Sequence, residues 1–162
     1  RVAKTTKGGK NFHFTALVVI GNNKDKVGAG LGKSNEVPDA IRKGIDKAKK
    51  NLIEISLNGR TISHEVYAKH LTSQVMIRPA SSGTGVIAGG AVRSVLELAG
   101  IKDVLTKSLG SRNPINVVNA TIECLKQLND PAKTADDHGK KQEDLDLPKQ
   151  YYRNKAEGEV NA

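Results

Sequence analysis

The chain has very little cysteine and few aromatic residues. One cysteine, Cys124, occurs among 162 residues, which excludes a disulfide framework and a cysteine-rich zinc module. There is no tryptophan, and three tyrosines and two phenylalanines are too few for a thick aromatic core. No apolar run approaches the roughly 20 residues that span a bilayer, and nothing at the start has the composition of a signal peptide. These absences predict a protein of a reducing compartment.

Acidic residues are also scarce relative to basic ones. The chain holds 26 Lys and Arg against 17 Asp and Glu, a net charge of +9, so a polyanion is the first partner to consider. Residues 1–50 hold 12 basic and 4 acidic side chains (net +8), and residues 51–128 hold 8 and 5 (net +3). Residues 129–162 hold 6 and 8 (net −2). The basic charge therefore lies in the first third of the chain.

Hydrophobic periodicity in residues 1–55 predicts a small first unit. Residues 2–7 and 12–20 are predicted strands, and a turn leads to a return strand over residues 27–31. A helix follows, with an apolar stripe made of Val37, Ala40, Ile41, Ile45, Ala48 and Leu52. Its separate basic stripe consists of Lys43, Lys47 and Lys50. The predicted unit is a three-stranded sheet backed by one helix.

Residues 56–128 are predicted to form a second unit. Its expected strands lie at residues 52–57, 65–69, 74–78 and 103–109, and its expected helices at residues 91–99 and 114–128. This order favours an α+β sandwich with the helices on one face of the sheet. The remaining residues, 129–162, are expected to form a disordered or docking tail, with a short helix formed on a partner as the alternative. Because the chain begins at Arg1 without methionine, we expect its native N-terminus to be missing.

Two glycine-rich stretches resemble nucleotide-binding motifs. Residues 28–34 end in Gly-Lys-Ser, but Val27 occupies the position of the first glycine of a phosphate loop. The alternating glycines fit a flattened strand that lets another backbone, of protein or RNA, come close. Residues 83–88 match a loose dinucleotide fingerprint without its βαβ context, which also fits a surface loop. A nucleotide-dependent enzyme using residues 28–34, and Lys33 in particular, is the alternative function from another class.

No arrangement of residues predicts catalysis or a metal site. The histidines at positions 13, 64, 70 and 138 lack the spacing of metal ligands. Glu65 beside His64 could support acid–base chemistry, but no pattern in the sequence indicates a nucleophile. Cys124 lies on the apolar arc of the last predicted helix and is interpreted as a core residue. We therefore expect no enzyme activity, no cofactor and no metal.

The basic loop near the N-terminus is the strongest candidate site. Lysines and hydroxyls around a Gly-Gly turn suit the phosphate backbone of RNA, and the few aromatic residues favour shape and phosphate contacts over base stacking. The candidate RNA-binding residues are Lys4, Thr5, Thr6, Lys7, Gly8, Gly9, Lys10, Lys24, Lys26, Gly28, Gly30, Arg42, Lys43 and Lys47. A protein-interaction module whose basic charge is incidental is a further alternative.

Seven stretches taken in order resemble one family. They are residues 7–10, 12–18, 27–33, 37–43, 83–90, 105–111 and 113–118. The chain resembles bacterial small-subunit ribosomal protein five over residues 1 to about 128. The tail matches nothing in this family, and we expect the family's usual opening segment to be missing.

The resemblance implies both a fold and a set of partners. The implied fold is a double-stranded-RNA-binding-like domain followed by a second domain with a left-handed βαβ crossover, which is contrary to the general rule. The implied role is that of a bacterial, cytoplasmic, ribosome-bound protein that binds small-subunit rRNA. Its implied neighbours are small-subunit ribosomal proteins four and eight and the messenger RNA near its entrance, with an influence on assembly and decoding accuracy. The residues implied to face protein four are Gly83, Gly85, Gly89, Gly90 and Arg93.

Overall fold

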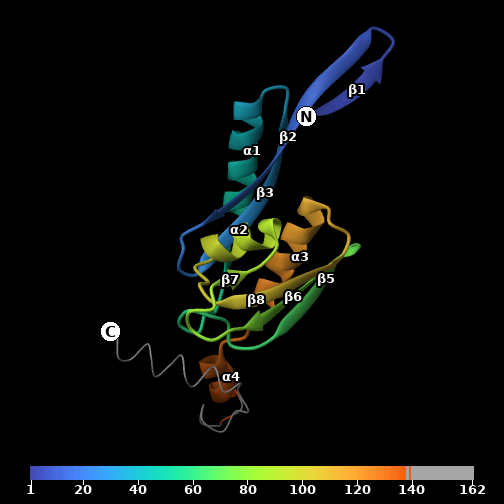
Figure 1. The fold of residues 1–162 in the computed structure, drawn as a ribbon. Helices are drawn as coiled ribbons and strands as arrows, with labels where there is room; N and C mark the ends of the chain where they lie inside the picture. The colour runs from blue at the N-terminus through green and yellow to red at the C-terminus, as the bar shows by residue number, and fades with distance from the viewer. Residues whose placement is uncertain (138, 140–162) are drawn as a thin grey trace.

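The first sheet is antiparallel and contains four strands. A computed structural model of the chain describes residues 1–137 and 139. The strands are β1 (Val2–Thr6), β2 (Gly9–Gly21), β3 (Lys26–Ser34) and β4 (Ile53–Glu54), in the order β1-β2-β3-β4 (Figure 1). The strand predicted over residues 52–57 was assigned to the second unit, and this assignment is wrong. Its two strand residues pair with the start of β3 instead, and they add a fourth strand to the three expected.

Strands β1 and β2 form a long hairpin that projects from the body of the protein (Figure 1). They pair from Val2 opposite His13 to Thr6 opposite Gly9, whereas β3 pairs only with the later part of β2, from Phe14 onward. Residues 1–12 are all exposed. The basic loop is therefore held at the end of a two-stranded arm.

Helix α1 (Val37–Lys50) packs on the face of β3 that is formed by Gly28, Gly30 and Gly32, here called the glycine face. A Cβ atom added at Gly28 would lie 2.5 Å from the carbonyl oxygen of Ala48, and one at Gly32 would overlap the carbonyl group of Ala40. The close backbone that the alternating glycines predict is therefore the chain's own helix. Because Gly28 and Gly30 are buried beneath it, they are removed from the candidate RNA-contacting residues.

This close packing also changes the buried stripe of α1. The buried residues of the helix are Ala40, Gly44 and Ala48, whereas Val37 and Ile41 are exposed. Leu52, just beyond the helix, is exposed as well. The predicted stripe is therefore wrong at these three large residues. The helix lies so near the glycine strand that only small side chains fit between them.

The second sheet has the order β5-β6-β8-β7, and it is mixed. Its strands are β5 (Val66–His70), β6 (Ser73–Pro79), β7 (Val86–Ile87) and β8 (Val104–Gly110). Strand β7 runs parallel to β8, and α2 (Gly90–Leu98) connects them, while α3 (Pro114–Lys126) packs on β5 and β6. The predicted α+β class is confirmed. The left-handed sense of the β7–α2–β8 crossover stays a prediction.

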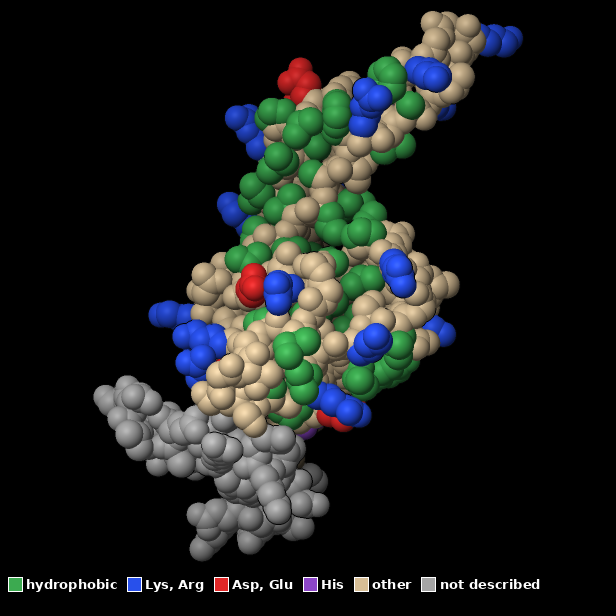
Figure 2. Space-filling view, viewed as in Figure 1, with side chains coloured by type: hydrophobic (Ala, Val, Ile, Leu, Met, Phe, Trp, Pro, Cys, Tyr) green, Lys and Arg blue, Asp and Glu red, His purple; other side chains and the backbone are tan. Residues whose placement is uncertain are grey.

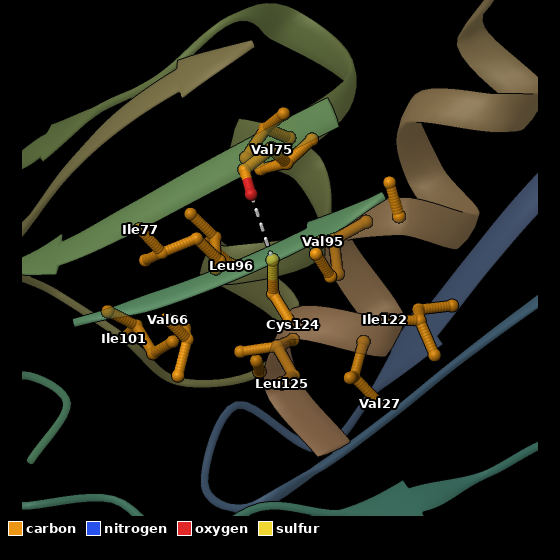
Figure 3. Close-up of a cluster of buried hydrophobic side chains, with 14 of the residues drawn as sticks. Val27, Val66, Val75, Ile77, Val95, Leu96, Ile101, Ile122, Cys124 and Leu125 are labelled. Atoms are coloured by element: carbon orange, nitrogen blue, oxygen red, sulfur yellow. Dashed lines mark hydrogen bonds between the residues drawn. The ribbon is translucent and has the colours of Figure 1, made fainter. Parts of the chain in front are cut away.

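One hydrophobic core joins the two sheets (Figure 3). Val27 of β3, Val75 of β6 and Leu125 of α3 belong to the same buried cluster, and side chains of β2 pack against it. Cys124 is fully buried, its thiol donates to the carbonyl oxygen of Val75 at 3.2 Å, and burial raises its pKa to about 11. The interpretation of Cys124 as a core residue is therefore confirmed.

The segment after α3 is more ordered than predicted. Residues Pro131–Asp137 form a further helix, α4, in which Ala135 is buried. The expected disordered tail therefore does not begin at residue 129, and residues 138 and 140–162 lie outside the described part of the chain. No helix in the described part is long and apolar enough to cross a membrane.

Candidate nucleic-acid interface

The tip of the β1–β2 hairpin presents cations on both faces of a thin ribbon. Thr5 pairs with Lys10 and Lys4 pairs with Asn11, so Lys4 and Lys10 lie on opposite faces because side chains alternate along a strand. Lys7 lies in the turn itself. A two-stranded ribbon of this kind can enter a groove or the gap between two RNA backbones and meet phosphates on either side.

The glycines and hydroxyls of the tip have separate roles. The hydroxyl of Thr6 donates to the carbonyl oxygen of Gly9 at 3.1 Å and closes the turn. Gly9 has a φ of +133°, a conformation that favours glycine. Gly8 has no such conformation, and a Cβ there would meet no other atom of the described residues within 4 Å. Nothing within the described chain therefore requires glycine at position 8.

A second basic surface lies along α1. Arg42, Lys43 and Lys47 are exposed, and the ammonium group of Lys43 lies 3.4 Å from the hydroxyl oxygen of Ser34 at the end of β3. Figure 2 shows Lys and Arg side chains along the hairpin and beside α1, with few acidic groups among them. None of the candidate lysines or Arg42 takes part in an ion pair within the described residues. Their charge is thus available to an external anion.

Lys24 and Lys26 lie away from the hairpin tip. Their turn is organised by Asn22, whose side-chain oxygen accepts the backbone N–H groups of Lys24, Asp25 and Lys26 at 2.9–3.0 Å. This turn sits at the other end of β2, about 40 Å from the tip by the rise of an extended strand. The structure therefore places the predicted lysines on three surfaces: the hairpin tip, the side of α1 and this turn.

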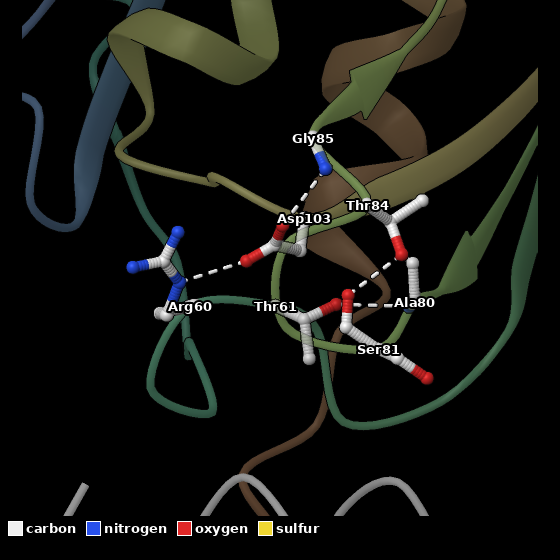
Figure 4. Close-up of polar contacts among 7 residues, drawn as sticks. All are labelled: Arg60, Thr61, Ala80, Ser81, Thr84, Gly85 and Asp103. Carbon is white, nitrogen blue, oxygen red and sulfur yellow. Dashed lines mark hydrogen bonds and ion pairs between the residues drawn. The ribbon is translucent and has the colours of Figure 1, made fainter. Parts of the chain in front are cut away.

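The loop between β6 and β7, residues 80–85, is anchored by a buried carboxylate (Figure 4). Asp103, only 1% exposed, accepts the backbone N–H of Gly85 at 2.8 Å and the side-chain Nε–H of Arg60 at 2.8 Å. Burial disfavours the charged carboxyl, but the hydrogen bonds from Arg60 and Gly85 and the charge of Arg60 together outweigh it. The pKa of Asp103 is therefore held below its ordinary value of 3.8. The sequence patterns did not single out Asp103 or Arg60, because burial of a lone acid at a strand start has no local signal.

The candidate partner residues lie along the segment from Gly83 to Arg93, in which Gly85 is held by this anchor. Gly83 and Gly85 have positive φ values, +88° and +77°, so their conformations require glycine. Gly89 and Gly90 have ordinary conformations, and a Cβ added at either position would meet no other atom of the described residues within 4 Å. Arg93 donates to the carbonyl oxygen of Val86 at 2.7 Å, which ties the start of α2 to β7.

The structure does not support the nucleotide-binding alternatives. Residues 28–34 lie within β3, whose backbone pairs with β2, so they form no loop of free N–H donors. The fingerprint at residues 83–88 runs into β7, and α2 begins two residues later at Gly90. No cluster of three metal-ligating side chains occurs among the described residues.

Comparison with known protein families gives a match to each of the two sheets with its helices. Residues 1–56 match the family described as ribosomal protein S5, N-terminal domain, and residues 68–138 match ribosomal protein S5, C-terminal domain. The chain belongs to the ribosomal protein S5 family. The S5 matches fall on the hairpin, glycine strand and α1 in the first part, and on the second sheet with α2 and α3 in the other. The resemblance seen in the sequence motifs is confirmed.

Individual S5 relatives agree with this assignment. Two proteins called small ribosomal subunit protein uS5, from Campylobacter jejuni strains 81-176 and RM1221, are each 59% identical to the chain over 128 residues. The alignments cover 79% of this chain and 87% of each relative. S5 is a family of RNA-binding ribosomal proteins and not a family of enzymes.

Proposed function

We propose that the chain is a structural constituent of the small ribosomal subunit in the bacterial cytoplasm and binds rRNA through the hairpin tip and the basic side of α1. The observation that carries this proposal is the set of exposed cations on both faces of the projecting ribbon. None of them is neutralised by an acidic neighbour in the described chain.

The binding mechanism is neutralisation of phosphates with release of counterions. Lys4, Lys7 and Lys10 meet the RNA backbone at the ribbon, and Lys43 and Lys47 meet it along α1. Open space at Gly8 lets the RNA backbone approach the protein backbone closely. Lys24 and Lys26 serve a second contact at the far end of β2.

The segment at residues 83–93, which contains β7 and the start of α2, is assigned to the contact with small-subunit ribosomal protein four. Gly89 and Gly90 support this assignment, since glycine there serves no need inside the described chain and leaves room for a neighbouring backbone. Contact with protein eight, a position at the messenger RNA entrance, and a role in assembly and decoding accuracy complete the proposal. These finer roles rest on the S5 relationship.

Salt dependence tests the rRNA contact. Affinity for small-subunit rRNA should fall by orders of magnitude between about 50 and 200 mM salt if six or more phosphates are contacted. The double variant Lys7→Ala with Lys10→Ala should bind more weakly and lower the log–log salt slope by about 1.5, because two phosphate contacts are lost. Lys102→Ala is the matched control, because Lys102 is exposed but lies outside the proposed surface. Equal slopes for wild type and double variant would remove the hairpin tip from the interface.

A further inference from the structure

The turn between β2 and β3 meets the C-terminal end of α2 (Figure 1). The backbone N–H of Asn23, in this turn, donates to the carbonyl oxygen of Leu98, the last residue of α2, at 3.0 Å. The last carbonyl groups of a helix have no partner within the helix itself. The first unit of the protein therefore caps a helix of the second unit, although the two segments lie far apart in the sequence.

The two backbones are in direct contact at this cap. A Cβ atom added at Gly21 would overlap the carbonyl group of Leu98. One added at Gly100 would lie 2.6 Å from the carbonyl oxygen of Asn23. Gly100 has a φ of +92° and Asn23 a φ of +58°, values that glycine and asparagine adopt more readily than other residues. Because backbone atoms meet backbone atoms, no side chain can rotate to change the spacing at this joint.

The same turn carries two of the candidate rRNA-contacting lysines, Lys24 and Lys26, and both are exposed. Asn22 organises the turn, because its side chain accepts three backbone N–H groups and its amide also donates to Oδ1 of Asp25 at 2.6 Å. Hydrogen bonds of this kind from an asparagine side chain fix the backbone of a turn. One polar side chain thus sets the backbone positions of both lysines and of the cap on α2.

Helix α2 carries the position of its C-terminal end to its N-terminal end. It has nine residues and is therefore about 13 Å long. Its first turn is tied to β7, since Arg93 donates to the carbonyl oxygen of Val86 at 2.7 Å. A change in the tilt of α2 at its capped end would therefore displace the segment at residues 83–93.

We propose that the turn at residues 22–26 is a positioning element that sets the tilt of α2, and with it the placement of residues 83–93, relative to the rRNA-binding first unit. Asn22 holds the turn in shape, and the backbone of Asn23 makes the contact with α2. This inference rests on the proposed function, since it is the rRNA contact and the protein contact that the joint holds in one frame. The competing explanation is that the shared hydrophobic core alone fixes the two units.

Distance measurement by pulsed electron paramagnetic resonance tests the joint in the full chain. Nitroxide labels are attached at Asp46→Cys on α1 and Ser94→Cys on α2, both exposed positions, while the buried Cys124 stays unlabelled. Gly21→Ala should shift the mean distance by about 1–2 Å, because the added methyl group needs a van der Waals separation from the end of α2. Gly90→Ala is the matched control and should leave the distance unchanged, because the methyl group there meets no other atom of the described residues within 4 Å.

Substitutions at Asn22 test the joint without adding atoms at the tight contact. Asn22→Ala should broaden the distance distribution about twofold, because the turn then samples several conformations. Asn22→Asp should also broaden it, since two carboxylates then face each other, and the further change Asp25→Asn should restore the wild-type width by restoring an amide–carboxylate pair. Thermal unfolding verifies that each variant is folded. Unchanged distributions in folded Gly21→Ala and Asn22→Ala proteins overturn the proposal, because the core alone would then fix the two units.

Binding to small-subunit rRNA separates this inference from the proposed function. Lys24→Ala with Lys26→Ala should lower the log–log salt slope by about 1.5 and leave the distance between the labels unchanged, since the backbone of the turn is kept. If the wild-type protein fails to bind the rRNA, the proposed function fails and the distances still decide whether the joint exists. If it binds the rRNA and the distances do not respond to the changes at Gly21 and Asn22, the positioning role alone fails.

Discussion

Arg60 and Asp103 form an unequal ion pair, since the Asp103 carboxylate is 1% exposed and the Arg60 side chain is 54% exposed. Their atoms Nε and Oδ2 are 2.8 Å apart. The other carboxylate oxygen of Asp103 accepts the backbone N–H of Gly85. The buried Asp103 carboxylate thus joins the turn at Arg60 to the loop that contains Gly85.

Loss of the Asp103 carboxylate should cost more than loss of its partner. Asp103→Ala leaves the N–H of Gly85 without its acceptor in a partly buried place, and we expect a loss of about 1–3 kcal/mol in the free energy of unfolding. Arg60→Ala should cost less, about 1 kcal/mol or below, because its guanidinium is largely solvated. Urea denaturation of both variants measures the difference. An equal cost for the two variants would contradict the role of Asp103 as the anchor.

Stability should depend on pH through the same carboxyl group. The pKa of Asp103 is lowered in the folded protein from its ordinary value of 3.8. Because its pKa is lowered on folding, the carboxyl group stabilises the fold fully at pH values above its pKa in the unfolded chain. This stabilisation is lost as the pH falls through its pKa in the folded protein. The difference in unfolding free energy between wild type and Asp103→Asn should therefore be constant from about pH 7 to pH 5 and shrink below about pH 4. If the difference in unfolding free energy stays constant down to the pH at which the protein unfolds, groups other than Asp103 cause the loss of stability in acid.

The sequence predicted the fold well wherever local periodicity decided the structure. The alternation through Phe14 and Val18 marks β2, and the arrangement of Pro114 after Asn113 marks the start of α3, where the Asn113 side chain accepts the N–H of Ile115 at 3.2 Å. The pairing of Ile53 with Val27 was missed because a two-residue strand has no period of its own.

The sequence predicted the candidate site only in part, and the reason is physical. Charge and spacing predict Lys7 and Lys10 as RNA-contacting residues, and the structure shows both of them exposed. Gly28 and Gly30 could be excluded as RNA-contacting residues only once the structure showed that the backbone of α1 covers β3. The sequence alone does not reveal whether the covering backbone belongs to the same chain or to a partner. Asp103 was missed because its burial arises from elements far apart in the chain.

The glycine face of β3 should tolerate no side chain. A Cβ at Gly30 would overlap backbone atoms of Gly44 and Ala48 in α1, and it would lie 2.9 Å from the Cβ of Lys47. Since backbone atoms cannot rotate away, Gly30→Ala should displace the helix and cost about 3 kcal/mol or more. Thermal or urea unfolding measures this loss.

A matched glycine substitution separates packing from backbone freedom. Gly8→Ala introduces the same methyl group where no described residue beyond its chain neighbours lies within 4 Å, so its effect on stability should stay within about 0.5 kcal/mol. A similar loss for Gly8→Ala and Gly30→Ala would show that the contact with α1 is not the cause.

Cys124 should behave as a reporter of unfolding. Its thiol is fully buried, and burial raises its pKa to about 11, so the reactive thiolate is both rare and shielded at neutral pH. In the native protein, labelling by a disulfide reagent should be slow and should accelerate in urea along with the loss of helical circular dichroism. Because Cys124 shares the core with Val75 and Leu125, its exposure requires the second sheet and α3 to separate. Fast, complete labelling in native buffer would mean that this part of the core opens independently of global unfolding.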